Sequence, residues 1–103
     1  MCAIGGFFDT KGSLMQKQNC YQTILEKMNH AQKHRGPDED GTYLDGFCGL
    51  SHARLSILDL TKGSQPMHYH TPKEDYWIIY NGEIYNMHTL RKEIKQMGIE
   101  FQT

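Results

Sequence analysis

The chain begins MCAIGGFF (residues 1–8), a stretch that sets the first strand and raises the first chemical question. Its apolar and small residues predict a short β-strand from Cys2 to Phe8, closed by the turn-forming sequence Asp9-Thr10-Lys11-Gly12. A cysteine at position 2 can be a small buried residue. It can also become the amino terminus once Met1 is removed, and a thiol then lies beside a free α-amine.

The second possibility has a clear chemical logic. Free α-amines have pKa values of about 7.7–8.0 and thiols of about 8.5. An amine held beside a thiol can therefore accept its proton near neutral pH and return it to a leaving group. Cys2 would then supply both nucleophile and base. Its position alone does not decide between this role and a packing role.

Two segments outside this strand carry helical patterns. Apolar residues at spacings of three and four predict a helix from Asn19 to His34, which Gly36-Pro37 ends. A second helix is expected over residues 87–97, with Asn86 as its N-cap and Gly98 as its stop. The buried stripe of this second helix is expected to consist of Leu90, Ile94 and Met97.

The remaining segments read as short strands and loops. YWIIY (residues 76–80) is the strongest strand candidate, because it is aromatic and β-branched throughout. Residues 61–73 are expected to form a loop, and Ile99 begins what resembles a new strand. Further β-like runs lie at residues 41–44, 47–55 and 57–60. Strands and helices mixed without a regular β-α-β alternation predict an α+β fold with largely antiparallel pairing.

Composition excludes several classes of function. The 103 residues are 38% hydrophobic and 22% charged, with a net charge of −1, as expected for one ordinary domain. This charge gives no footprint for nucleic acid or an anionic membrane, and the apolar runs are shorter than a membrane span. The three cysteines lack CxxC spacing, which argues against a disulfide framework or a structural zinc site. A reducing cytoplasm is the expected location.

Asn81-Gly82-Glu83 follows the YWIIY strand directly. An Asn-Gly pair after a strand is often only a turn, because both residues tolerate positive φ. The alternative is an oxyanion hole, in which the asparagine NH₂ and the glycine N–H converge on a developing negative charge. The local sequence leaves both open.

Arg54 lies inside the strand-like run His52-Ala53-Arg54-Leu55-Ser56-Ile57. A buried guanidinium is costly unless it pairs with an anion. Its partner is expected to be Asp59, Asp38 or the carboxylate of a substrate, which an arginine can bind with two parallel hydrogen bonds.

Two pairs of histidines have chelating spacing. His30 and His34 are four residues apart on the predicted helix, and His68 and His70 are two apart on an extended segment. Neither pair has a nearby third ligand with a known signature, so exposed or capping roles are favoured and no metal site is expected.

Five segments together resemble one family: MCAIGGFF, HRGPDEDG, LSHARLSILDL, GSQPM and YNGEIYN. Their order and spacing are similar to those of the N-terminal glutaminase domain of glutamine-hydrolysing asparagine synthetases. That domain is a class II glutamine amidotransferase with the N-terminal-nucleophile hydrolase fold. The resemblance covers nearly the whole chain. It implies an αββα sandwich with antiparallel sheets, of which residues 1–103 would form the first part.

The resemblance implies a role for each matching residue. Cys2 would attack the side-chain amide of glutamine, and Asn81 and Gly82 would stabilise the oxyanion. Arg54 would bind the α-carboxylate of glutamine and Glu83 its α-ammonium. The backbone that would line the glutamine pocket belongs to Leu55, Ser56, Ile57 and Leu58.

The same resemblance implies the reaction partners. Glutamine hydrolysis needs no cofactor, whereas aspartate, ATP and Mg²⁺ would act in a synthetase domain that lies outside residues 1–103. A further family aspartate is expected just beyond Phe101-Gln102-Thr103. We therefore expect this chain by itself to be a poor glutaminase and to self-associate through uncovered strands. The alternative function is an inactive amidotransferase-like module that only binds glutamine or a protein.

Overall fold

The computed structural model describes residues 2–55 and 63–101 of the chain. Within them the elements follow in the order β1 (Ala3–Phe8), η1 (Leu14–Lys17), α1 (Gln18–Ala31), η2 (Lys33–Arg35), β2 (Glu39–Leu44), β3 (Cys48–Arg54), β4 (Met67–His70), β5 (Asp75–Ile78) and α2 (Met87–Gln96). The strands form a three-stranded sheet in the order β1-β3-β2 and a separate hairpin, β4-β5. All named strand pairs are antiparallel. The expected α+β class with antiparallel sheets is confirmed.

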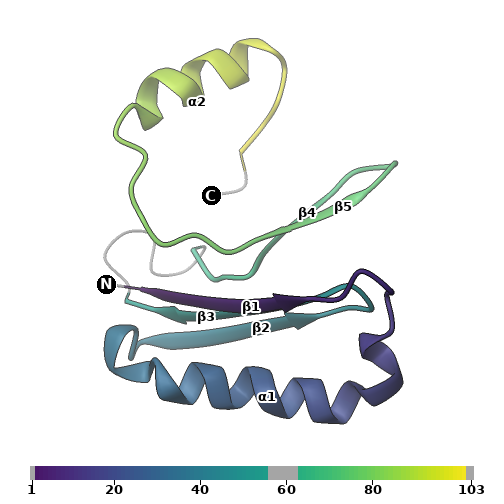
Figure 1. Ribbon diagram of the computed structural model, residues 1–103. Coiled ribbons are helices and arrows are strands. Elements are labelled where there is room, and N and C mark those ends of the chain that lie inside the picture. The colour runs from purple at the N-terminus through teal and green to yellow at the C-terminus, as the bar shows by residue number, and fades with distance from the viewer. Residues whose placement is uncertain (1, 56–62, 102–103) are drawn as a thin grey trace.

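The elements lie in layers. Figure 1 shows α1 along one face of the three-stranded sheet, the β4-β5 hairpin over the opposite face and α2 beyond the hairpin. This order of helix, sheet, sheet and helix agrees with the αββα arrangement that the sequence led us to expect.

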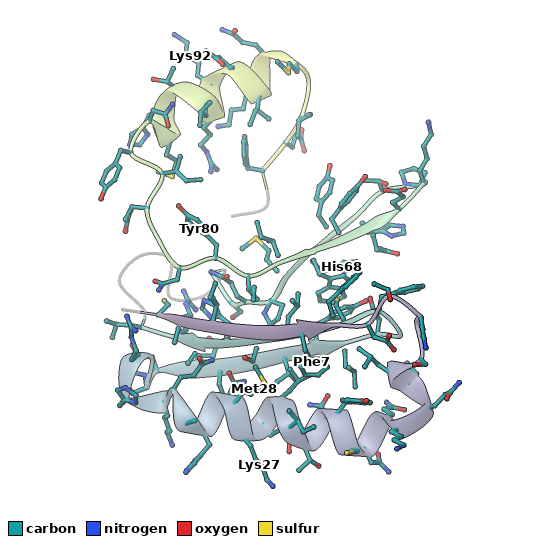
Figure 2. The ribbon with its side chains drawn as sticks, in the orientation of Figure 1. Phe7, Lys27, Met28, His68, Tyr80 and Lys92 are labelled. Carbon is teal, nitrogen blue, oxygen red and sulfur yellow. The ribbon has the colours of Figure 1, made fainter. Side chains whose placement is uncertain are left out.

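The face of the sheet toward α1 holds the core. Leu25 of α1 and Ala53 of β3 are fully buried. Phe7 and Met28 point into the layer between β1 and α1, whereas Lys27 points away from it (Figure 2). A Cβ at Gly5 would lie only 2.7 Å from Cε of Met28, so glycine is what lets the helix approach the strand this closely.

The opposite face of the sheet meets the hairpin. Side chains directly opposite each other in an antiparallel pair share a face, and residues two apart share it as well. His52 and Arg54 of β3 therefore lie on one face with Ile4 of β1 and Glu39 of β2, their register partners. The hairpin covers this face, because the ring of Trp77 in β5 stacks on Tyr43 of β2 with centroids 4.0 Å apart.

Several sequence predictions need correction. The first helix ends at Ala31 and gives way to the 3-10 turn η2, three residues before the predicted end. The expected loop over residues 61–73 contains strand β4. The YWIIY strand begins at Asp75 and ends at Ile78. Residues 99–101 are not in a strand. The β-like run at 57–60 lies outside the described residues.

The second helix was located correctly, but its predicted apolar stripe is not buried. Gly98 follows it with a φ of +85°, as expected of a glycine that ends a helix. Asn86 occupies the N-cap without a side-chain capping bond. Leu90 and Met97 are exposed, since no described element packs closely over this face of the helix.

Candidate active site

Cys2 lies immediately before β1 and is half-buried. Its Sγ accepts a hydrogen bond from the backbone N–H of Leu55 at 3.4 Å and lies 3.8 Å from the Leu55 carbonyl oxygen. The structure thus brings the predicted nucleophile together with the first residue of the predicted glutamine pocket. The other three pocket residues, Ser56, Ile57 and Leu58, lie outside the described residues.

Arg54 is the buried cation of the site, only 4% exposed. Its Nη1 donates to Oε2 of Glu39 at 3.2 Å, and its backbone carbonyl accepts from the N–H of Asp38 at 3.0 Å. Glu39 therefore joins the carboxylates considered from sequence. Glu39 pairs with Arg54 because the register of β2 and β3 places the two residues directly opposite each other. This register cannot be predicted from the local spacing of residues in the sequence. Asp59 lies outside the described residues.

The loop after β5 is fixed through Tyr80. The N–H of Tyr80 donates to Oε1 of Gln65 at 2.6 Å, and its hydroxyl donates to the carbonyl of Glu83 at 3.3 Å. The side chains of Asn81 and Glu83 are exposed. Within the described residues, the hydrogen bonds of Cys2 go to the backbone of Leu55 and none joins it to this loop.

His52 connects the loop to the sheet, and sequence reasoning missed it. Its Nε2 lies 3.3 Å from the carbonyl oxygen of Tyr80, the residue just before Asn81. A carbonyl oxygen can only accept, so this contact requires the proton on Nε2. Nδ1 is then a bare acceptor, and it is buried with no hydrogen-bond partner among the residues that the structure describes. The sequence feature that could have pointed to His52 was its place two residues before Arg54, on the same face of the predicted strand.

We expect acid to destabilise the fold through His52. Burial lowers the pKa of this side chain below its ordinary value of 6.5, and the nearby Arg54 adds to the effect. The unfolded chain therefore accepts a proton that the folded chain resists. The contribution of neutral His52 to the free energy of unfolding is fully present above about pH 6.5. It falls as the pH drops toward the lowered pKa, by at most about 1.4 kcal/mol per pH unit.

Melting temperatures at pH 7 and pH 5 measure this effect. The wild-type chain should lose more stability on acidification than His52→Gln, in which the amide keeps a donor for Tyr80 but cannot titrate. Equal losses in both proteins would show that other groups cause the acid sensitivity.

Two hollows of the surface lie away from these residues. One, of about 580 Å³, runs along α2 and is lined by His88, Arg91, Lys92, Lys95 and Gln96. The other, of about 250 Å³, lies between α1 and β2. We place the candidate site at Cys2, because the candidate nucleophile and the buried Arg54 lie beside the same segment, at Leu55.

Three further observations concern other kinds of site. All three cysteines are free thiols. In the part of the chain that the structure describes, the group of side chains able to hold a metal ion is His68, His70 and Asp75, on the hairpin. Among the described helices, none has the length and hydropathy required of a transmembrane span.

Comparison with known families gives a match over the whole chain. Residues 1–103 fit the model of a family described as "Glutamine amidotransferase domain".

Comparison with individual proteins agrees. The chain is 43% identical over 103 residues to asparagine synthetase [glutamine-hydrolyzing] 1 of Bacillus subtilis, covering all of this chain and 16% of that protein. It is 37% identical over 103 residues to asparagine synthetase B [glutamine-hydrolyzing] of Escherichia coli, covering all of this chain and 17% of that protein. The chain thus spans about a sixth of the length of these curated relatives.

Proposed function

Because the chain belongs to the glutamine amidotransferase domain family, we propose that it hydrolyses the side-chain amide of glutamine with Cys2 as nucleophile. The observation that carries this proposal is the position of the Cys2 thiol. Its sulfur lies against the backbone of Leu55, directly after the strand whose last residue is Arg54. A nucleophile and a cation that can bind a carboxylate thus lie beside the same segment.

The proposed chemistry uses one side chain and one amine. With Met1 removed, the α-amine of Cys2 accepts the thiol proton while sulfur attacks the amide carbon. The C–N bond then breaks, and the proton leaves with ammonia. A γ-glutamyl thioester remains on Cys2. Water, deprotonated by the same amine, attacks this thioester and releases glutamate and the free thiol. No external cofactor enters these steps.

Other residues bind and orient the substrate in this proposal. Arg54 holds the α-carboxylate of glutamine and Glu83 its α-ammonium. Asn81 and Gly82 donate hydrogen bonds to the oxyanion, because an amide NH₂ and an open backbone N–H both suit a developing negative charge. The pocket wall is the backbone of Leu55, Ser56, Ile57 and Leu58. His52 acts on Asn81 only through the carbonyl of Tyr80, as a positioning residue.

Arg54→Lys should raise the KM for glutamine by about 10–100-fold with a smaller effect on kcat. Lysine keeps the charge but loses the planar fork that binds both carboxylate oxygens. Hydrogen bonds to charged groups contribute about 1.5–3 kcal/mol, which corresponds to this change in KM. Steady-state kinetics of glutamate release by the protein that carries this domain measure both constants.

The matched control is Arg91→Lys, which alters an arginine of α2 whose guanidinium lies 4.2 Å from the ring centre of Phe101. It should leave KM unchanged. A fall in kcat with an unaltered KM in Arg54→Lys would remove the carboxylate-binding role and leave Arg54 as a structural partner of Glu39.

We further propose that the released ammonia is used for asparagine synthesis. The support is that the relatives above are named as glutamine-hydrolysing asparagine synthetases. Aspartate, ATP and Mg²⁺ would then be needed by a part of the protein beyond residues 1–103. The free thiols fit a reducing compartment, and we place the reaction in the cytoplasm.

Glutamine-dependent formation of asparagine, measured in the protein that carries this domain, tests the proposal. Glutamate release without asparagine formation would support glutamine hydrolysis and contradict the use of the ammonia for asparagine synthesis. Glutamine binding without glutamate release would favour the alternative of a binding module.

A further inference from the structure

Three side chains converge on the hairpin. Nε2 of His68 lies 2.8 Å from Oδ1 of Asp75, and Nδ1 of His70 lies 2.6 Å from the same oxygen. The three candidate ligand atoms all lie within 4.8 Å of one another. Each side chain is accessible from solvent, with exposed fractions of 41%, 72% and 52% in that order.

The register of the hairpin creates this cluster. His70 is directly opposite Asp75, and His68 is directly opposite Trp77. Because residues two apart share a face of a strand, both histidines and the aspartate lie on the same face. The turn between them is closed by Thr71, whose N–H donates to the carbonyl of Glu74 at 2.8 Å and whose Oγ1 accepts from the N–H of Glu74. The backbone therefore fixes the spacing of the three groups.

Stacked rings hold His68 in place. Its imidazole stacks on Trp77 with centroids 4.2 Å apart and planes 11° apart, and Trp77 stacks on Tyr43 of the neighbouring sheet. Figure 2 shows His68 on the side of the hairpin that faces the three-stranded sheet. A ligand held by its surroundings loses little freedom on binding a metal, so this arrangement favours coordination.

We propose that His68, His70 and Asp75 form a binding site for a divalent transition metal of the zinc type. Two imidazole nitrogens and one carboxylate oxygen suit Zn²⁺, whereas Mg²⁺ and Ca²⁺ prefer oxygen ligands. Metal–ligand bonds of about 2.0–2.2 Å in tetrahedral geometry place the ligand atoms roughly 3.3 Å apart. The carboxylate must therefore withdraw by about 0.5 Å from the His68 nitrogen and about 0.7 Å from the His70 nitrogen, which exposed side chains permit. Water completes the coordination.

This inference revises the interpretation of the His68-x-His70 motif. Sequence alone gave two ligands and no third, because Asp75 lies across the hairpin turn. A bound metal would cross-link β4 to β5 beside the hairpin turn, at the end of β5 that lies away from Tyr80. The site is independent of the proposed glutamine hydrolysis, since it shares none of its residues.

Zinc titration followed by isothermal calorimetry tests the site. Zn²⁺ alone should bind the full chain, and each of His68→Gln, His70→Gln and Asp75→Asn should weaken binding by at least about 10–100-fold, the loss typical of even an outer-shell partner. Mg²⁺ under the same conditions should not bind. Circular dichroism of each variant establishes that it is folded, which exposed positions on a hairpin should allow.

Two matched controls separate this site from other donors. Glu74→Gln removes the carboxylate next to Asp75, and the double variant His30→Gln/His34→Gln removes the paired histidines near the end of α1. Both should bind Zn²⁺ as the wild type does. Absence of Zn²⁺ binding would overturn the proposal, as would binding that survives in the His68, His70 and Asp75 variants. Visible absorption of the Co²⁺ form adds a second measurement: intense thiolate charge-transfer bands would assign the metal to a cysteine and also overturn it.

Discussion

In the protein that carries this domain, replacing Cys2 by alanine should abolish glutamate release, with a loss on the order of 10⁴-fold or more, because the reaction then lacks the atom that forms the thioester. Alanine is small enough for the half-buried position just before β1, so the fold should be retained. In the protein that carries this domain, asparagine synthesis driven by added ammonia should continue at its normal rate. Parallel assays with glutamine and with ammonium chloride measure the two activities.

Cys20→Ala is the matched control for this result. Cys20 is an exposed thiol on α1, remote from Leu55, and its removal should leave both activities unchanged. Blocking the removal of Met1 should reproduce the Cys2→Ala result, because the α-amine is then part of a peptide bond. Near-normal glutamate release by Cys2→Ala would show that another group is the nucleophile.

Asn81→Ala should lower kcat for glutamine hydrolysis by about 10²–10³-fold, the usual loss for one oxyanion donor, with a smaller change in KM. The structure supplies a reason why this asparagine can be held in place. The preceding Tyr80 is anchored at its N–H by Gln65 and at its carbonyl by His52. A fixed donor contributes more to the transition state than a mobile one, because it needs no reorganisation during the reaction.

Asn86→Ala provides the comparison for that substitution. Asn86 lies five residues further along the chain, at the start of α2, and its side chain makes no capping hydrogen bond. Its replacement should leave kcat unchanged. If Asn81→Ala raised KM while kcat stayed normal, Asn81 would be a substrate-binding residue and the oxyanion donor would have to be found elsewhere.

Much of the fold could be predicted because its elements carry strong local patterns. Small and apolar residues identified β1, and helical spacing around Leu25 identified α1. Strand β4 was missed, since Met67-His68-Tyr69-His70 is too short for its alternation to stand out, and it follows a proline. It is a strand because β5 pairs with it, which is a tertiary cause. The apolar stripe of α2 was predicted as buried from its period alone, and period does not show what covers a helix.

Some residues of the candidate site could likewise be predicted from the sequence, and others could not. Cys2 and Asn81 could be proposed because a short motif and its chemistry pointed to them. The Arg54–Glu39 ion pair and the contact of His52 with Tyr80 could not, because strand register and the path of the hairpin create them. Both contacts join residues that are far apart in the sequence, and the local spacing of residues carries no information about such contacts.

If the sulfur of Cys2 carries the γ-glutamyl group during hydrolysis, intact-protein mass spectrometry after acid quenching should detect this adduct. During turnover of glutamine by the protein that carries this domain, we expect a mass increase of one γ-glutamyl group, located by digestion in the peptide that begins at Cys2. The adduct should be absent from Cys2→Ala and retained in Cys20→Ala. Steady glutamate release with the adduct on Cys20 or Cys48, or with no adduct on any cysteine under conditions that preserve thioesters, would show that Cys2 is not the nucleophile.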